Sequence, residues 1–224
     1  MIARYGDSQK PKMVVGAHYD VFHNQPGADD NASAVAGLLE IARLIRANGL
    51  ETAFEIEFVA YTLEEPPFFL TDRMGSFIHA ESLYKAGETV RGMISLEMIG
   101  YFTSEEDSQE YPFAIMKWFY PSVGDFIGVV GNFGSRSLVD GMAEYMKTAA
   151  IGVETLKAPA LVPGVDESDH RNYWHFGYQA VMITDTAYFR NPNYHRESDT
   201  MDTLDFEKMA EVVTGVTWAL TNMK

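Results

Sequence analysis

The chain has 224 residues, a length that suits one α/β domain, and its 46% hydrophobic residues suffice for a core, which excludes global disorder. Acidic residues (32) outnumber basic residues (17), and the net charge of −15 argues against a nucleic-acid partner, which needs a basic surface. The chain has no cysteine, so disulfides and thiolate metal sites are excluded, and any metal must be held by His, Asp and Glu.

No stretch of the sequence approaches the roughly 20 consecutive apolar residues that a membrane-spanning helix needs, so we expect no membrane partner. The opening segment, MIARYGDSQKPK, lacks the apolar region of a signal peptide. We therefore expect a soluble protein that is cytoplasmic by default, with a secreted or periplasmic location left open.

Short apolar runs that favour strands alternate with segments of helical periodicity. In chain order, we expect strands at Met1–Tyr5 and Met13–Tyr19, a helix at Ser33–Asn48, a strand at Ala53–Thr62, a helix at Ser76–Ala86, strands at Gly92–Met98 and Phe126–Gly131, a helix at Ser137–Ala149, a strand at Ala180–Thr184 and a closing helix from Phe206 to Leu220. This alternation predicts an α/β sheet with helices on both faces.

Sheets of this kind bind ligands beyond the carboxyl ends of their strands. Residues able to do chemistry follow the predicted strands at these positions: His18, Asp20, Glu64, Glu65, Glu97, Asp185 and, further along, His195. Their clustering at strand ends predicts a shared site.

Three short segments carry the strongest signals. The pair His18 and Asp20 is typical of a metal-binding histidine whose imidazole is oriented by a nearby carboxylate. A surface histidine is the simpler alternative. Asp29 and Asp30 open a helix, where plain helix capping is the alternative, with Asn31 or Ser33 as the cap.

The third segment is the carboxylate pair Glu64 and Glu65, which follows a strand and precedes two prolines. One carboxylate can bind metal while its neighbour acts as acid or base, a division of labour that metal hydrolases use. An acidic surface loop is the alternative.

Taken together, these segments resemble the zinc-dependent exopeptidases that include bacterial leucyl aminopeptidases, glutamate carboxypeptidase and glutaminyl cyclase (metallopeptidase family twenty-eight). The resemblance runs from about Lys12 to the C-terminus and rests on VVGAHYD, GADDNASAVAGLLEIAR, YTLEEP with MGS following, ISLEMIGY, SDH and YHRESDT. It implies a three-layer α/β/α sandwich with a mostly parallel, mixed central sheet, of the zinc-exopeptidase (phosphorylase/hydrolase-like) type.

The resemblance also implies two Zn²⁺ ions, with Co²⁺ or Mn²⁺ as substitutes, held by five side chains: His18, Asp30, Glu65, Glu97 and His195. In this scheme Asp30 bridges the ions, Asp20 orients His18, and Glu64 is the general base for a water held between the ions. Many relatives have Asp at the Glu97 position, so the longer side chain is a departure from the family pattern.

Substrate contacts are expected from Tyr188 and Tyr194, which precede His195, although ordinary packing is the alternative for each tyrosine. Asp169 is grouped with them as a residue near the site, for which the resemblance implies a supporting role. The run Pro66–Phe69 is a candidate apolar wall for a substrate side chain. His23, His79 and His175 belong to no motif, and His79 is expected to be a surface or packing residue.

The leading hypothesis is a two-zinc aminopeptidase that acts on peptides. The alternatives are a single-zinc glutaminyl cyclase, a relative without catalytic activity, and a carboxypeptidase, for which four arginines offer a carboxylate-binding group: Arg136, Arg171, Arg190 and Arg196. We expect residues 1–224 to form one catalytic domain, short at its N-terminus relative to the family, and we predict self-association into a homo-oligomer.

Overall fold

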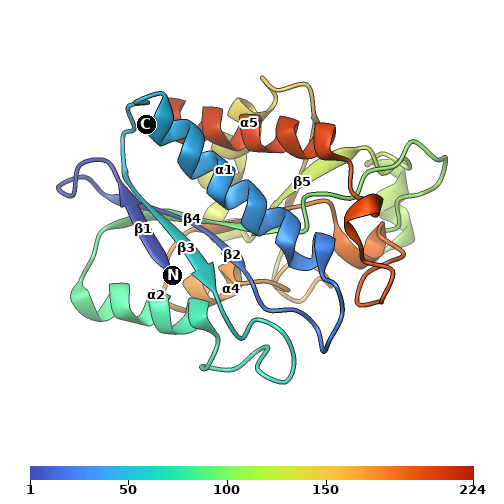
Figure 1. The fold of residues 1–224 in the computed structure, drawn as a ribbon, viewed down its shortest axis with the longest axis horizontal. Coiled ribbons are helices and arrows are strands. Elements are labelled where there is room, and N and C mark those ends of the chain that lie inside the picture. The colour runs from blue at the N-terminus through green and yellow to red at the C-terminus, as the bar shows by residue number, and fades with distance from the viewer.

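The computed structural model describes residues 1–224, which fold around one seven-stranded sheet with the order β1-β3-β2-β4-β7-β5-β6 (Figure 1). The strands are β1 (Ile2–Tyr5), β2 (Lys12–His18), β3 (Glu55–Tyr61), β4 (Val90–Glu97), β5 (Phe126–Gly131), β6 (Gly152–Lys157) and β7 (Ala180–Thr184). Neighbours in the sheet are parallel except for two antiparallel pairs, β1 with β3 and β5 with β7. The predicted mixed, mostly parallel sheet is therefore confirmed.

Helices cover both faces of the sheet, as Figure 1 shows for α1 and α5 on one side and α2 and α4 on the other. The helices are α1 (Ala34–Ala47), α2 (Gly75–Ala86), α3 (Arg136–Met146), α4 (His170–His175) and α5 (Phe206–Asn222). Strand β2 is apolar on both faces because Met13 and Val15 join the core under α1 and α5, whereas Val14 joins the core under α2. No helix is both long and apolar enough to cross a lipid bilayer.

Among the strands and α-helices, two were not predicted, β6 and α4. Strand β6 lies at the edge of the sheet and mixes polar with apolar residues, so its sequence GVETLK carries no clear alternation. Helix α4 has six residues, fewer than two turns, which is too short for a periodic signal.

The predicted caps of α1 were wrong. Neither Asn31 nor Ser33 bonds a free N–H of the helix; instead, Asn31 accepts from the amide of Met98 and donates to the carbonyl of Leu96. Ser33 accepts from the amide of Ile99. Both side chains thus fasten the start of α1 to the end of β4, which brings the adjacent Asp30 to the carboxyl ends of the strands.

His79 is buried in α2, where it belongs to a polar chain beneath the sheet. Its Nδ1 lies 2.6 Å from the hydroxyl of Tyr173, and that hydroxyl lies 2.8 Å from the hydroxyl of Tyr61. On its other side, His79 Nε2 lies 3.3 Å from a Glu57 carboxylate oxygen. Of the two roles expected for His79, packing is therefore the one observed.

We predict that Tyr173→Phe lowers the free energy of unfolding by about 1–3 kcal/mol, because it removes the buried hydrogen-bond partner of His79 Nδ1 and of the Tyr61 hydroxyl. Urea unfolding followed by circular dichroism measures this change. The matched control is Tyr178→Phe, since the Tyr178 ring contacts Tyr173 while its hydroxyl bonds no protein group. Equal losses in the two variants would contradict the prediction.

His170, the first residue of α4, is fully buried beside Trp174, and Nε2 donates to the carbonyl of Val165. Burial lowers its pKa to about 4. The His170 imidazole therefore takes up a proton at higher pH in the unfolded chain than in the folded chain. The stability that comes from burying the neutral imidazole is fully present above about pH 6.5 and is lost as the pH falls toward 4.

We expect His170 to account for about 2 kcal/mol of the stability lost between pH 7.5 and pH 5. The pH dependence of urea unfolding should be shallower by that amount in His170→Gln. His175→Gln, a change at an exposed histidine of the same helix, should leave the slope unchanged. The prediction fails if both variants follow the wild-type slope.

Candidate metal centre and active site

The predicted site residues meet at the carboxyl ends of three neighbouring strands. His18 ends β2, Glu97 ends β4, and Glu64 and Glu65 follow β3. Because β2 lies between β3 and β4 in the sheet, these side chains converge, although they lie far apart in the sequence. Asp30, before α1, and His195, in the loop after β7, reach the same point.

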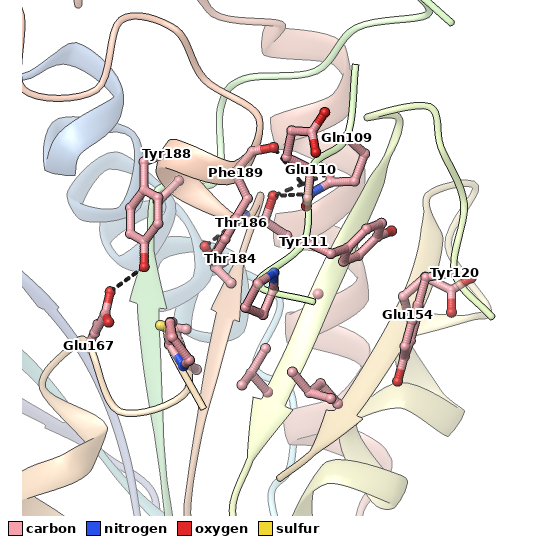
Figure 2. A pocket seen from close by; sticks show the side chains of 18 of the residues that line it. Gln109, Glu110, Tyr111, Tyr120, Glu154, Glu167, Thr184, Thr186, Tyr188 and Phe189 are labelled. Carbon is pink, nitrogen blue, oxygen red and sulfur yellow. Dashed lines mark hydrogen bonds between the residues drawn. The ribbon is translucent and has the colours of Figure 1, made fainter. Parts of the chain in front are cut away.

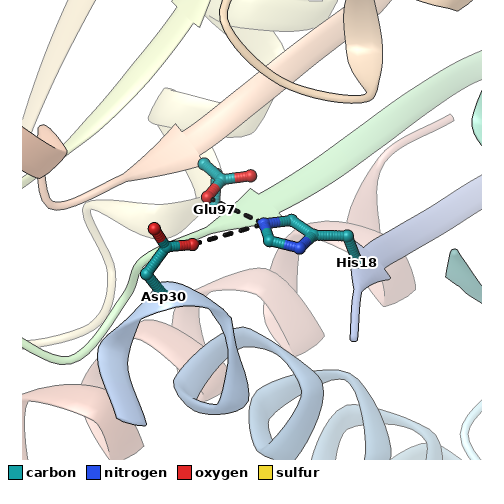
Figure 3. Close-up of side chains that lie close together, drawn as sticks. All are labelled: His18, Asp30 and Glu97. Carbon is teal, nitrogen blue, oxygen red and sulfur yellow. Dashed lines mark hydrogen bonds and ion pairs between the residues drawn. The ribbon is translucent and has the colours of Figure 1, made fainter. Parts of the chain in front are cut away.

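Asp30 lies between two imidazoles. Its Oδ1 is 3.4 Å from Nε2 of His18, and its Oδ2 is 3.2 Å from Nε2 of His195. Each imidazole also faces a second carboxylate: Glu97 Oε1 is 3.3 Å from His18, as Figure 3 shows, and Glu65 Oε2 is 3.4 Å from His195. The arrangement is a pair of His–carboxylate sets that share one aspartate.

These distances fit metal coordination. Ligand atoms placed about 2.1 Å from a tetrahedral Zn²⁺ lie about 3.4 Å from one another, close to the separations of 3.2–3.4 Å observed here. In addition, Glu65 Oε1 is buried without a hydrogen-bond partner. Two sets of nitrogen and oxygen donors, each around a shared point, are therefore suited to Zn²⁺, Co²⁺ or Mn²⁺.

Asp20 connects two of the strand ends. Its carboxylate accepts the backbone N–H groups of Glu64 and Glu65, at 3.3 and 3.1 Å. Nδ1 of His18 lies 3.1 Å from the backbone carbonyl of Asp20 and 3.6 Å from its carboxylate. Donation from Nδ1 to that carbonyl leaves the lone pair of Nε2 directed at Asp30 and Glu97.

Further polar groups, whose roles no sequence motif indicated, hold the proposed ligands in place. Asp199 accepts the amides of Asp29 and Asp30, at 2.9 and 3.1 Å, which fixes the turn that carries Asp30. Ser168 donates to Glu97 Oε2 at 2.7 Å. Asp199 lies in the YHRESDT motif and Ser168 in the SDH motif. The sequence therefore pointed to both segments but not to the roles of these two residues.

Aromatic rings fix the orientation of His195. The Phe22 ring stacks on the imidazole with centroids 4.1 Å apart, and the Tyr194 ring stacks on it at 3.8 Å. The backbone of His195 has a positive φ of 56°, and the Gln25 side chain donates a hydrogen bond to its carbonyl. These contacts hold the imidazole of a loop residue against the ligand cluster.

The buried acidic and basic groups of the site shift one another's pKa values. Burial, together with the negative charges of Glu97 and Asp169, raises the pKa of Glu64 well above its usual value. Burial by itself would lower the pKa of His18, but the negative charges of Glu97 and Glu64 outweigh this effect and raise it. Burial would also raise the pKa of Asp30, but His18 and His195 lower it to about 2, so Asp30 stays ionised.

Two cavities adjoin this cluster and share Glu97, Glu167 and Tyr194. The smaller holds about 410 Å³ of empty space over Asp30, Glu64 and His195, and the larger holds about 830 Å³; both volumes include space open to solvent. Neither lining contains a lysine or an arginine. The four arginines considered for a carboxylate site therefore line neither cavity.

The three predicted substrate contacts differ in position. Tyr194 lines both cavities, and Tyr188 lines the larger one while its hydroxyl donates to Glu167 at 2.7 Å. Asp169, in contrast, is fully buried and lines neither cavity, and its carboxylate oxygens have no hydrogen-bond partner. Asp169 therefore lies behind the site rather than on its surface, where burial and nearby carboxylates raise its pKa to about 7.

Comparison with known proteins gives close and distant relatives. The uncharacterized protein YfbL of Escherichia coli K12 is 46% identical over 233 residues, which cover 100% of this chain and 71% of that protein. Leucine aminopeptidase 1 of Coccidioides posadasii is 26% identical over 212 residues, covering 89% of this chain and 49% of that protein. The chain thus spans about half the length of this aminopeptidase.

Solved structures share the fold. LapB of Legionella pneumophila has a TM-score of 0.73 and 24% identity, covering 99% of this chain and 55% of that chain. Glutaminyl cyclase of Bacteroides thetaiotaomicron has a TM-score of 0.69 and 19% identity, covering 100% of this chain and 77% of that chain. The family model of Peptidase family M28 matches residues 1–218, and the chain therefore belongs to Peptidase family M28.

Proposed function

We propose that the chain is a metal-dependent exopeptidase, a two-zinc aminopeptidase that removes N-terminal residues from peptides. One observation carries this proposal: the two oxygens of Asp30 face two separate imidazoles, each of which has a carboxylate of its own. A shared carboxylate is the ligand that two closely spaced dications require, because their mutual repulsion is otherwise large.

In this proposal, His18 and Glu97 hold one ion, Glu65 and His195 hold the other, and Asp30 serves both. Zinc bound there would polarise the scissile carbonyl and lower the pKa of the attacking water. Glu64 lies at the edge of the cluster, with Oε2 3.9 Å from His18 Nε2, and its carboxylate accepts no hydrogen bond from the protein. It is therefore free to take the proton of the water and return it to the leaving amine.

The charge of the cavities favours an amino-terminal substrate over a carboxy-terminal one. Carboxylates line both cavities and no lysine or arginine does, so a cationic α-amino group is attracted and a substrate carboxylate is repelled. This argues against the carboxypeptidase hypothesis, which requires an arginine or lysine at the site. Leucine aminopeptidase 1, a relative by sequence, bears a name that agrees with the proposal.

The main remaining alternative is a glutaminyl cyclase, which uses one zinc ion. The second His–carboxylate set, His195 with Glu65, favours the peptidase because a one-ion enzyme has no need of it. The retention of both sets also argues against a relative without catalytic activity.

A panel of substrates tests the proposal. The zinc-loaded protein should hydrolyse aminoacyl anilides, leave N-acetylated peptides intact, and form no pyroglutamate from peptides with N-terminal glutamine. Release of C-terminal residues from acetylated peptides would support a carboxypeptidase, and cyclisation without hydrolysis would support a cyclase. Either result contradicts the aminopeptidase proposal.

A further inference from the structure

The larger cavity runs across the sheet as a trough that begins at the proposed metal centre. Glu97 in β4 is in register with Thr184 in β7, Thr184 with Gly128 in β5, and Gly128 with Glu154 in β6. Residues in register point to the same face of a sheet, and all four line this cavity. The trough therefore has one carboxylate at the metal centre and another at its far end.

The side chains between these carboxylates leave the trough open. Thr184 is small and Gly128 has no side chain, and a methyl group added at Gly128 would lie 3.2 Å from the carbonyl of Thr184. The next row of the same face, Met182, Val130 and Leu156, supplies an apolar floor. Helix α3 packs in the core on the other face of β5 and β6, so loops with short 3-10 turns, rather than an α-helix, form the opposite wall.

Glu154 has no partner within the protein. Tyr111 and Tyr120 pack beside it with ring centroids 5.7 Å apart, and the charge of Glu154 contributes, after burial, to the raised pKa of Tyr120. Both hydroxyls donate elsewhere, to the carbonyls of Pro121 and Thr155. Lys117, which follows the lining residue Met116, pairs with Glu110 instead of Glu154.

Figure 2 shows Glu154 and Tyr120 on one side of the cavity and Glu167, bonded by Tyr188, on the opposite side. An unpaired carboxylate beside two tyrosine rings is a favourable site for an organic cation, which gains an ion pair and contact with the ring faces. An aliphatic side chain alone would fill the trough and leave this carboxylate without a counter-ion.

The length of the trough limits the ligand. Neighbouring strands lie about 4.8 Å apart, so three strand intervals separate the backbones of Glu97 and Glu154 by roughly 14 Å. An extended lysine side chain spans about 6 Å from Cα to Nζ, and its hydrogen bond adds about 3 Å. About 5 Å of the trough then remains between the lysine Cα and Glu97, which is room for the backbone of the substrate residue beside the ligand cluster.

We propose that this trough binds the side chain of the first substrate residue and that Glu154 selects a long aliphatic chain with a cationic end, lysine or arginine. The inference rests on the proposed function, because it places the N-terminal residue of a peptide at the metal centre. Glu154 acts as a specificity residue at the tip of the substrate side chain, remote from the scissile bond.

The test compares lysine with norleucine, which has the same aliphatic length and no charge. We expect zinc-loaded wild type to cleave lysyl p-nitroanilide with a kcat/KM about 10-fold or more above that for the norleucyl compound. Glu154→Gln should reduce this ratio by about 10-fold. The control Glu144→Gln makes the same charge change on α3, at the opposite face, and should keep the wild-type ratio.

A binding measurement separates this inference from the proposed function. Calorimetry of zinc-loaded Glu64→Gln protein should give tighter binding of Lys-Ala-Ala than of norleucyl-Ala-Ala, and adding Glu154→Gln should remove the difference. If zinc-loaded wild type hydrolyses none of the anilides, but the binding difference is present and depends on Glu154, the inference about the trough stands and the aminopeptidase proposal fails. If the anilides are cleaved and Glu154→Gln changes neither the ratio nor the binding difference, the inference about Glu154 is overturned while the proposed function stands.

Discussion

Replacement of Glu64 by glutamine is expected to lower kcat by about 10²–10⁴-fold while leaving zinc content and KM close to wild type. The amide matches the carboxylate in shape but cannot take a proton from water. Glu64 supplies no contact shorter than 3.9 Å to His18, whereas the proposed ligands lie 3.2–3.4 Å from the imidazoles, so its loss should not empty the site.

The adjacent carboxylate provides the matched control. Glu65→Gln removes a proposed ligand that faces His195, so both activity and zinc content should fall. Steady-state kinetics with leucyl p-nitroanilide and elemental analysis of the same samples distinguish the two variants. Full activity in zinc-loaded Glu64→Gln would show that the assigned base is wrong.

The second large effect is expected at Asp30. Wild type should contain two zinc ions per chain, and Asp30→Ala should contain fewer than one, with activity reduced at least about 100-fold. Removal of the shared carboxylate takes a ligand from both sets and leaves any two ions to repel each other. Dialysis against a chelator should likewise abolish activity, which added Zn²⁺ or Co²⁺ should restore in wild type.

Elemental analysis by plasma mass spectrometry measures the metal content. Asp202→Asn, a change at an exposed carboxylate that bonds Thr200, serves as the control and should retain two ions. One ion per wild-type chain would favour the cyclase over the peptidase. Two ions per chain in Asp30→Ala would show that Asp30 does not bridge them.

The sequence predicted most of the fold because its strands and helices carry strong periodic signals. The apolar run of β2 and the i, i+3, i+4 pattern of α1 each determine one kind of element and the face that it buries. Strand β6 escaped prediction because it is a half-buried edge strand, whose amphipathic pattern is weak. This omission matters because β6 carries Glu154 at the end of the trough.

The positions of the candidate ligands were also accessible from sequence, because each lies at the boundary of an element in a recognisable motif. The interactions that orient them were not. Ser168 reaches Glu97, and Phe22 stacks on His195, across distances in the chain that no local pattern spans. The position of Asp169 was not accessible either. Asp169 was grouped with the substrate contacts, but it is buried behind the site.

The sequence by itself indicated the membership in Peptidase family M28, through the motifs that resemble the family, and the order of the candidate ligand residues along the chain, because motifs are local. Only the tertiary structure decided that the two oxygens of Asp30 face different imidazoles, and that Glu97 and Glu154 share one row across four strands. Both facts depend on the strand order and register of the sheet, which arise from packing between segments distant in the chain.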